Sequence, residues 1–296
     1  ARSTDRARRE AGVTVGPPRQ QLAEVGSVSA CGAYLMLTLR LPGVMDFRAG
    51  QFAALAVGGP SSSLLLRRCF SIYRIDRELL RIVFAAHGAG TRWLAALQPG
   101  DVVDVVAPLG TPFPFPAGAG PAVLIGGGYG SAPLFSLASA LRGRGSEAHF
   151  VLGAASADRL FGVEEAGALG SSVTVTTDDG SAGVRGWVSD ALPSVLARTG
   201  AGTVYACGPM PMLDAVNSLA AAAGAVAYVA VEEAMACGIG VCMTCVLPVV
   251  GADGLTRMTR SCVDGPVFAG SALPWDAAAT GAVPADALGA AAMGGR

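Results

Sequence analysis

Short apolar runs with polar interruptions fill the chain from about residue 23 to residue 110. Gly, Pro and other turn residues separate these runs, which is typical of strands joined by tight turns. The predicted strands cover residues 34–41, 50–57, 68–75, 79–86 and 101–108, and one stretch of helical character, residues 90–100, interrupts them. Many short strands at this spacing predict an antiparallel β-barrel or sandwich.

The pattern changes after residue 121, where strands and helices alternate. Apolar runs at 122–126, 148–154, 172–177 and 203–208 predict strands, and the segments 134–145, 157–169, 184–197 and 210–224 predict helices. Strands that are apolar throughout and alternate with helices are typical of a doubly wound parallel sheet. The stretch "FPFPAGAGP", residues 113–121, has the composition of a linker between the two parts.

These changes of pattern divide the chain into five segments. We expect a mobile tail over residues 1–22, a β-barrel domain over 23–116, an α/β domain over 117–228, a cysteine-rich domain over 229–271, and a loose Ala- and Gly-rich tail over 272–296. The fold prediction is therefore multidomain, with an antiparallel β-barrel, a parallel α/β sheet and a small C-terminal domain.

Composition narrows the possible functions. Hydrophobic residues make up 52% of the chain and the formal net charge is −1, so nothing favours a nucleic acid or an anionic membrane as a partner. Gly, Pro and Ser break the longest apolar runs, and no apolar region follows the Arg-rich start. We therefore expect a cytoplasmic protein without membrane spans, in which clustered cysteines are metal ligands or catalytic groups more often than disulfides.

Four of the seven cysteines follow the spacing C-x4-C-x2-C-x16-C, with ligand candidates Cys237, Cys242, Cys245 and Cys262. The first three spacings match the plant-type [2Fe–2S] ligand pattern. Gly238 and Gly240 suit a loop that wraps closely around a cluster, because glycine tolerates positive φ. A zinc site prefers two separated knuckles, which fits this spacing poorly, and disulfides fit a reducing compartment less well still. Zinc and purely structural cysteines stay open as alternatives.

Two short motifs on the predicted barrel suit a flavin. In "RRCFSI", residues 67–72, Arg68 can neutralise a pyrophosphate, Phe70 can lie against an isoalloxazine, and Ser71 can hydrogen-bond near the flavin N5. Alone, the motif also describes an ordinary strand. "HGAGT", residues 87–91, offers backbone N–H groups to a phosphate at the start of the predicted helix.

Two further motifs suit a dinucleotide. "LIGGGYGSAP", residues 124–133, places glycines between a strand and a helix, although it does not satisfy G-x-G-x-x-G with its acidic partner. "ACGPMPML", residues 206–213, follows another strand end, where Cys207 either faces a nicotinamide or is a small buried hydrophobe. Glu232 and Glu233, just before the cysteines, lie either near a flavin or nicotinamide or on a solvated hinge.

The order of these motifs resembles the ferredoxin–NADP reductase superfamily and, within it, the electron-transfer subunits of class 1B dihydroorotate dehydrogenase. "IGGGYGSAPL", "CGPMPML", "MACGIGVCMTC" and "CVDGPVF" carry the resemblance, which covers about residues 23–275. The sequence departs from the family pattern at Cys69 and Phe70, where Pro and an aliphatic residue are common, and at Tyr129, where an aliphatic residue is common.

The resemblance implies three cofactors and their binding residues. FAD would contact Arg68, Cys69, Phe70, Ser71, Val83, Phe84, Ala85, Gly90 and Thr91. NAD would contact Gly126, Gly127, Gly128, Gly130, Cys207, Gly208, Pro209 and Met210. The four cysteines, Cys237, Cys242, Cys245 and Cys262, would ligate a [2Fe–2S] cluster. No catalytic residue is predicted.

The same resemblance implies an oxidoreductase of pyrimidine biosynthesis. An FMN-containing dihydroorotate dehydrogenase subunit would pass electrons through the cluster and FAD of this chain to NAD+, in a heterotetramer of two plus two subunits. The alternatives are a subunit of an NAD(P)H–ferredoxin reductase or of a sulfhydrogenase-type diaphorase, and a zinc-bearing structural subunit. Neither nucleic acid nor membrane is expected as a partner.

Overall fold

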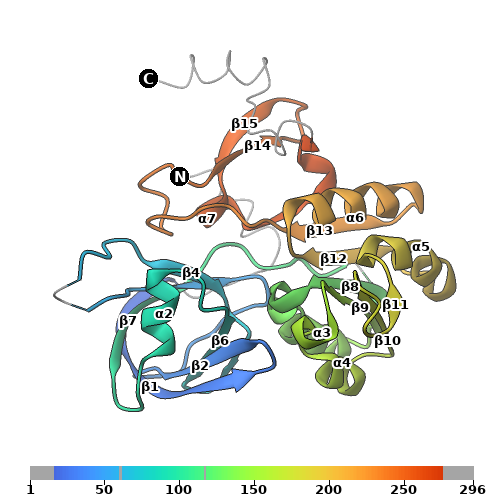
Figure 1. Cartoon of the computed structure of the whole chain (residues 1–296). Helices are drawn as coiled ribbons and strands as arrows, with labels where there is room; N and C mark the ends of the chain where they lie inside the picture. Colours follow the sequence, from blue (N-terminus) through green and yellow to red (C-terminus); the bar gives the residue numbers. More distant parts are fainter. Residues whose placement is uncertain (1–16, 60–61, 117, 276–296) are drawn as a thin grey trace.

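The structure, a computed structural model, describes residues 17–59, 62–116 and 118–275. Figure 1 shows three regions: an antiparallel sheet (blue to cyan), an α/β layer (green to yellow) and a small C-terminal region (orange to red) that lies over both. This arrangement confirms the multidomain fold expected from the sequence. Residues 1–16 and 276–296, which include most of the two predicted tails, lie outside the described residues.

The first region is an antiparallel sheet of seven strands within the described residues, in the order β4-β3-β7-β1-β2-β6-β5. Its strands are β1 (Arg19–Cys31), β2 (Tyr34–Arg40), β3 (Phe52–Leu55), β4 (Arg68–Ser71), β5 (Arg74–Asp76), β6 (Leu79–Phe84) and β7 (Val102–Leu109). A short helix, α2 (Ala89–Ala95), follows β6. Apolar residues such as Leu37, Leu39 and Ile82 are fully buried inside the curled sheet, as their alternation along the strands predicts.

The barrel strands differ from the sequence expectations in two places. Strand β1 begins at Arg19, so residues 19–22 belong to the sheet rather than to a tail. Polar Gln20 and Gln21 pair there with Val106 and Val105 of β7, and hydropathy alone does not mark such a strand start. The single strand expected over 68–75 is divided into β4 and β5, which pair with different neighbours, β3 and β6.

The second region is a sheet in the order β11-β10-β9-β8-β12-β13-β16, parallel throughout except for β16. Its strands are β8 (Ala122–Gly127), β9 (Ala148–Ala154), β10 (Ser172–Thr177), β11 (Val184–Arg185), β12 (Thr203–Cys207), β13 (Val226–Ala230) and β16 (Val267–Ala269). The helices are α3 (Ala132–Gly143), α4 (Val163–Leu169), α5 (Val188–Thr199) and α6 (Met210–Ala222), with 3-10 turns η1 (Gly128–Ser131) and η2 (Ala157–Arg159). Separate apolar clusters cover the two faces, which explains why the strands are apolar throughout.

The third region consists of the cysteine segment (residues 231–245, between β13 and β14), the hairpin β14 (Val246–Val250) and β15 (Thr256–Arg260), and the helix α7 (Ser261–Asp264). The chain then returns to the α/β sheet, because β16 pairs with β13 and is followed by η3 (Gly270–Ala272). Leu273 is buried, and the indole of Trp275 donates to the carbonyl of Gly270. The described structure therefore continues past the predicted boundary at residue 271.

A polar contact among Tyr73, Arg74 and Glu165 joins the barrel to the α/β layer. Glu165 of α4 accepts a hydrogen bond from the Tyr73 hydroxyl and pairs with Arg74 of β5. Next to it, the ring of Tyr73 packs edge-on against Phe135 and Phe161. These contacts link the barrel to the α/β layer. Among the described helices, none is long and apolar enough to cross a membrane.

Candidate functional site

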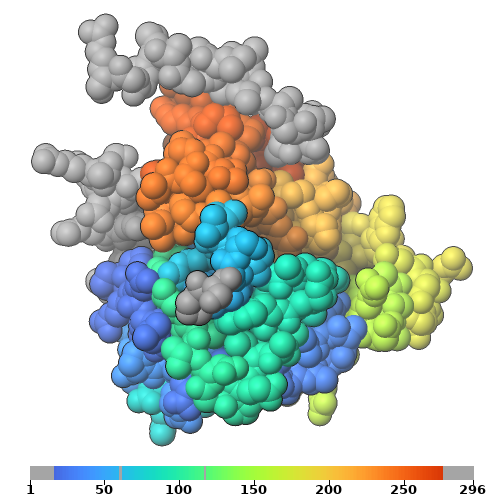
Figure 2. All heavy atoms as spheres, turned by 60° about the vertical axis from the view of Figure 1, so that its left-hand side comes forward, coloured from blue at the N-terminus to red at the C-terminus, as the bar shows by residue number. Residues whose placement is uncertain are grey.

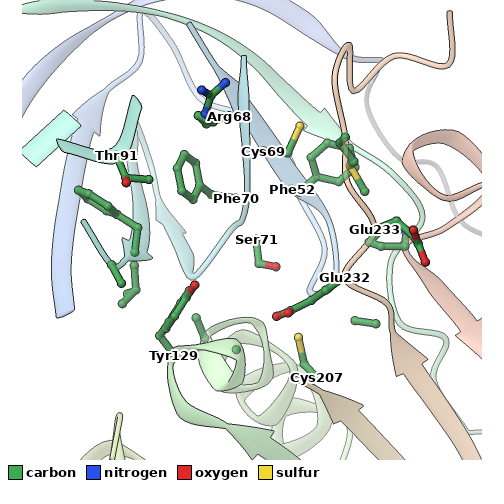
Figure 3. A pocket seen from close by; sticks show the side chains of 18 of the residues that line it. Phe52, Arg68, Cys69, Phe70, Ser71, Thr91, Tyr129, Cys207, Glu232 and Glu233 are labelled. Carbon is green, nitrogen blue, oxygen red and sulfur yellow. The ribbon is translucent and has the colours of Figure 1, made fainter. Parts of the chain in front are cut away.

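A cavity of about 430 Å³ lies between the barrel and the carboxyl edge of the α/β sheet. Figure 3 shows that side chains reach it from both domains and from the segment before the cysteines. Eight of the nine residues predicted for FAD line it: Arg68, Cys69, Phe70, Ser71, Val83, Phe84, Ala85 and Thr91. The ninth, Gly90, lies behind Arg68, where an added Cβ would be 2.8 Å from the guanidinium Nε.

The barrel side of the cavity combines an apolar wall with a cationic end. Phe70 and Phe84 pack with their ring centroids 5.8 Å apart. Arg68 lies against the first turn of α2, where the Gly88 N–H donates to the Thr91 hydroxyl over 3.0 Å. A flat apolar surface that ends in a guanidinium and backbone N–H groups fits an aromatic ring system linked to phosphate. The residues present therefore fit the flavin expected from the sequence.

The opposite side is built where β8 and β12 end side by side. Gly130 and Cys207 line the cavity, and an added Cβ on Gly130 would be 3.3 Å from the Cys207 carbonyl oxygen. Cys207 is 4% exposed, and burial raises the pKa of its thiol well above the usual value. The glycines let two strand ends and a ligand approach one another closely, at the edge where open α/β sheets bind nucleotides.

The other residues predicted for NAD lie beside the cavity rather than in its wall. Gly126 and Gly127 end β8 and Gly128 begins the turn after it, whereas Gly208 and Pro209 follow β12 and Met210 begins α6. The two segments touch, because an added Cβ on Gly127 would be 3.3 Å from Cδ of Pro209. The structure thus brings both motifs to one sheet edge.

The cavity is also lined by residues outside the sets predicted for FAD and NAD. Tyr129, Glu232 and Glu233 line it, as do Phe52, His87, Gly88, Ala132, Ala230, Val231, Met235 and Pro266. In Figure 3, the Glu232 carboxyl points into the cavity, below Ser71 and close to Cys207, whereas the Glu233 carboxyl points away from the cavity. Burial raises the pKa of both carboxyl groups, so neither of them lies on a fully solvated hinge. From the sequence, Glu232 and Glu233 could lie either near a flavin or nicotinamide or on a solvated hinge. Phe52 and Met235 belong to no motif that marks them as part of a site.

The four cysteines come together in two pairs. The Cys237 Sγ accepts backbone N–H groups of Val241 and Cys242 at 3.3 and 3.4 Å, and the Cys245 Sγ accepts that of Cys262 at 3.4 Å. Gly238 and Gly240 adopt φ values of +70° and +81°, which close the loop around the first sulfur. Backbone donors directed at cysteine sulfur stabilise thiolates.

Two pairs of thiols suit a [2Fe–2S] cluster. All seven cysteines are free thiols. A [2Fe–2S] cluster needs two thiolates at each iron, whereas structural zinc needs four ligands around one centre. Hydrogen bonds with Thr244 lower the pKa of the Cys242 thiol to about 6, so this thiol ionises more readily than a free cysteine.

The cysteine segment packs against the strand that lines the cavity. An added Cβ on Gly238 would be 3.2 Å from the Sγ of Cys69 in β4 and 3.4 Å from Ala54 in β3. Cys245 and Cys262 share an apolar cluster with Phe52 and Ala54 of the barrel. Figure 2 shows the segment (orange) resting on the β3–β4 side of the barrel (blue to cyan). The cavity and the cysteines are therefore separated by the thickness of one strand.

Comparison with known proteins leads to the same family that the sequence motifs resemble. Residues 232–273 match the family model of the iron–sulfur cluster binding domain of dihydroorotate dehydrogenase B. The chain is 41% identical over 226 residues to the electron transfer subunit of dihydroorotate dehydrogenase B (NAD(+)) from Geobacillus thermodenitrificans, covering 74% of this chain and 84% of the relative. It is 39% identical over 260 residues to the subunit of the same name from Bacillus caldolyticus, covering 86% and 97%.

Among solved structures, the fold is similar to that of an NADH-dependent reduced ferredoxin–NADP oxidoreductase, a structure described in the context of flavin-based electron bifurcation. The TM-score is 0.75 at 29% identity, with 87% of this chain and 91% of the other covered. The FAD/NAD binding domain of a nitric oxide dioxygenase from Vibrio cholerae has a TM-score of 0.61 at 21% identity, covering 69% and 94%, which is a likeness of fold alone.

Proposed function

This chain belongs to the family of electron transfer subunits of dihydroorotate dehydrogenase B, and from that premise we propose that it carries electrons from a dihydroorotate-oxidising partner subunit to NAD+. The observation that carries the proposal is the packing of the paired cysteines on β4, the strand that also lines the cavity. When bound, a [2Fe–2S] cluster and FAD supply the exchange between single electrons and a hydride.

The barrel residues are suited to hold FAD. Arg68, beside the turn that begins α2, offers positive charge to the pyrophosphate, and Phe70 offers an apolar surface to the ring system. Ser71 points into the middle of the cavity (Figure 3), where its hydroxyl can hydrogen-bond to the ring edge. With FAD bound, these residues would orient its ring system and shield one face of it from water.

The third region is suited to hold the cluster. Cys237 and Cys242 would bind one iron, and Cys245 and Cys262 the other. The N–H groups directed at the sulfurs of Cys237 and Cys245 support this assignment. We further propose the domain division expected from the sequence, with FAD on the barrel, NAD on the α/β layer and the cluster on the cysteine-rich part.

The turns after β8 and β12 are suited to hold NAD(H), with Gly130, Cys207 and Glu232 nearest to the flavin side. We propose that the partner is the FMN-containing catalytic subunit, in a heterotetramer of two plus two subunits, and that the assembly acts in the cytoplasm in pyrimidine biosynthesis. The names of the relatives support the partnership and the use of NAD+.

Purification with iron, sulfide and flavin analysis tests the proposal. The wild-type chain should contain two irons, two sulfides and one FAD, and should copurify with a dihydroorotate-oxidising subunit when the two are coexpressed. A ferredoxin or hydrogenase subunit recovered as the physiological partner would contradict the assignment. A colourless protein that contains zinc would contradict the cluster.

The substitution Cys262→Ser separates the two cofactors. Cys262 is 1% exposed and lies in the buried pair, so its loss should reduce the iron content to less than about half while FAD and its reduction by NADH remain. Electron transfer to the partner should stop. Cys31→Ser is the matched control, because Cys31 lies in β1, outside the cysteine-rich segment, and should leave the iron content unchanged. Unchanged iron in the Cys262 variant would exclude this residue as a ligand.

A further inference from the structure

Arg260 and Asp264 are the charged side chains that lie next to a cysteine of the predicted cluster site in sequence. Residues 234–252, which include the other three cysteines of that site, contain no charged side chain. Arg260 ends β15 and Asp264 ends the short helix α7, with Cys262 between them. Within the third region, these two residues are therefore the first candidates for a charge that acts on the cysteines.

Direct contacts hold the Arg260 guanidinium against the cysteine loop. Its Nη1 donates to the Gly240 carbonyl over 3.1 Å, and Gly240 lies between Cys237 and Cys242 in the chain. An added Cβ on Gly240 would be 2.4 Å from Cγ2 of Val263 and 3.4 Å from Nη1 of Arg260. This glycine therefore contacts both α7 and the guanidinium, and the positive charge is held at the loop that carries Cys237 and Cys242.

Asp264 supplies the opposite charge from the other side of Cys262. Its Oδ2 lies 3.7 Å from Nε of Arg260, and the side chains of Arg260 and Asp264 are 39% and 21% exposed. An ion pair at this separation lacks the two short hydrogen bonds of a bidentate pair, and water screens it in part. The two side chains therefore place charges of opposite sign next to Cys262 without binding each other tightly.

We propose that Arg260 and Asp264 set the reduction potential of the cluster in opposite directions, with Arg260 raising it and Asp264 lowering it. The inference rests on the proposed [2Fe–2S] site and adds the residues that tune it. One-electron reduction adds one negative charge to the cluster and its four thiolates, so a nearby cation stabilises the reduced form and a nearby anion destabilises it. The electron comes from the partner subunit and goes on to FAD, so these two charges decide how readily each electron is accepted and passed on.

The test is a redox titration of the FAD- and cluster-loaded protein, with dithionite as the reductant and the EPR signal of the reduced cluster as the readout. Arg260→Gln keeps a hydrogen-bond donor for Gly240 and removes the positive charge, whereas Asp264→Asn removes the negative charge at nearly equal size. We expect the potential to fall in Arg260→Gln and to rise in Asp264→Asn. Because water screens both side chains in part, each substitution should change the ratio of reduced to oxidised cluster at a fixed potential by about three- to tenfold, which is about 30–60 mV for a one-electron couple.

Two control variants separate the effect of charge from structural damage. Arg260→Lys keeps the positive charge and should leave the ratio within about twofold of wild type. Arg257→Gln removes an arginine from the same strand, where Arg257 pairs with Asp253 and is 52% exposed. Arg257 lies about 10 Å along the strand from Arg260, so screening should keep its effect below about twofold.

The direction of the two shifts decides the outcome, because general loosening of the site would move both potentials the same way. Shifts of the same sign, or unchanged potentials with full iron content, would overturn the proposal. If Arg260→Gln does not retain iron, Asp264→Asn decides alone: a higher potential supports the proposal, and an equal or lower one overturns it. A wild-type chain without iron and sulfide would contradict the proposed function itself, which is a different result.

Discussion

The polar contact among Tyr73, Arg74 and Glu165, between the barrel and the α/β layer, should control the stability of the cofactor cavity. Glu165 of α4 accepts a hydrogen bond from the Tyr73 hydroxyl and forms an ion pair with Arg74, so its carboxylate links the two domains. Burial and, after it, the hydrogen bond with Glu165 raise the pKa of Tyr73, so the phenol remains a donor at neutral pH. We therefore expect Glu165→Gln to loosen the interface on which the cavity depends.

The size of the effect follows from the exposure of the two partners. Tyr73 is 7% exposed, and a hydrogen bond from a buried donor to a charged acceptor contributes about 1.5–3 kcal/mol. The side chains of Arg74 and Glu165 are 38% and 25% exposed, so solvent screening limits their ion pair to about 1 kcal/mol or less. Because glutamine keeps an acceptor oxygen, we expect a loss of about 2 kcal/mol, equivalent to about 3 °C in Tm for a chain of 296 residues.

Urea denaturation and calorimetry of the FAD-loaded protein measure this loss, and FAD retention on gel filtration reports on the cavity. Glu164→Gln is the matched control, since Glu164 is exposed on the same helix. It should change Tm by less than about 1 °C, the usual range for surface substitutions. A Glu165→Gln variant as stable as Glu164→Gln, with FAD fully retained, would refute the reasoning.

Two further predictions concern the barrel and its contact with the cysteines. Although burial opposes its ionisation, hydrogen bonds led by that from Arg67 hold the pKa of Asp104 below its usual value, so the stabilisation is complete above the ordinary aspartate pKa and is lost as the pH falls through the lower folded pKa. Asp104→Asn should cost about 1–2 kcal/mol at pH 7 and almost nothing near pH 2, as urea midpoints across this range will show. Gly238→Ala places a methyl 3.2 Å from the Cys69 Sγ and should lower the iron content, whereas Gly254→Ala, also at positive φ but with open space around it, should not. Equal iron contents in the two glycine variants would contradict close packing of the cysteine segment on β4.

Periodicity was enough to predict most of the fold. The alternation along β2 and β6, and the wholly apolar strands β8 and β9, reflect which faces are buried, and burial is local in sequence. What periodicity missed depends on pairing between distant segments. The polar start of β1 is ordered by β7, and β16 joins the α/β sheet through β13, and neither pairing leaves a local pattern.

The candidate site shows the same difference between features that are local in sequence and features that depend on contacts between distant segments. Arg68, Phe70 and Ser71 could be placed in a cavity from a six-residue motif, because one strand positions all of them. Tyr129 and Glu232 reach the same cavity from two different elements of the chain, and their roles depend on how the domains meet. Residue type marks a position as chemically capable, but only the docking of barrel on sheet decides what it faces.

Strand β4 contacts both the cavity and the cysteine segment. Arg68 and Phe70 line the cavity, and Cys69 between them lies against Gly238. Burial, followed by the neighbouring thiols of Cys237 and Cys245, raises the pKa of Cys69 to about 12, so it stays a neutral thiol beside the cysteine pairs. A neutral, small, polarizable side chain at this point keeps the two sites close without adding a charge between them. An ionised residue there would cost desolvation energy and would bias any electron that passed. The uncommon cysteine in the barrel motif is therefore consistent with a contact between two redox sites.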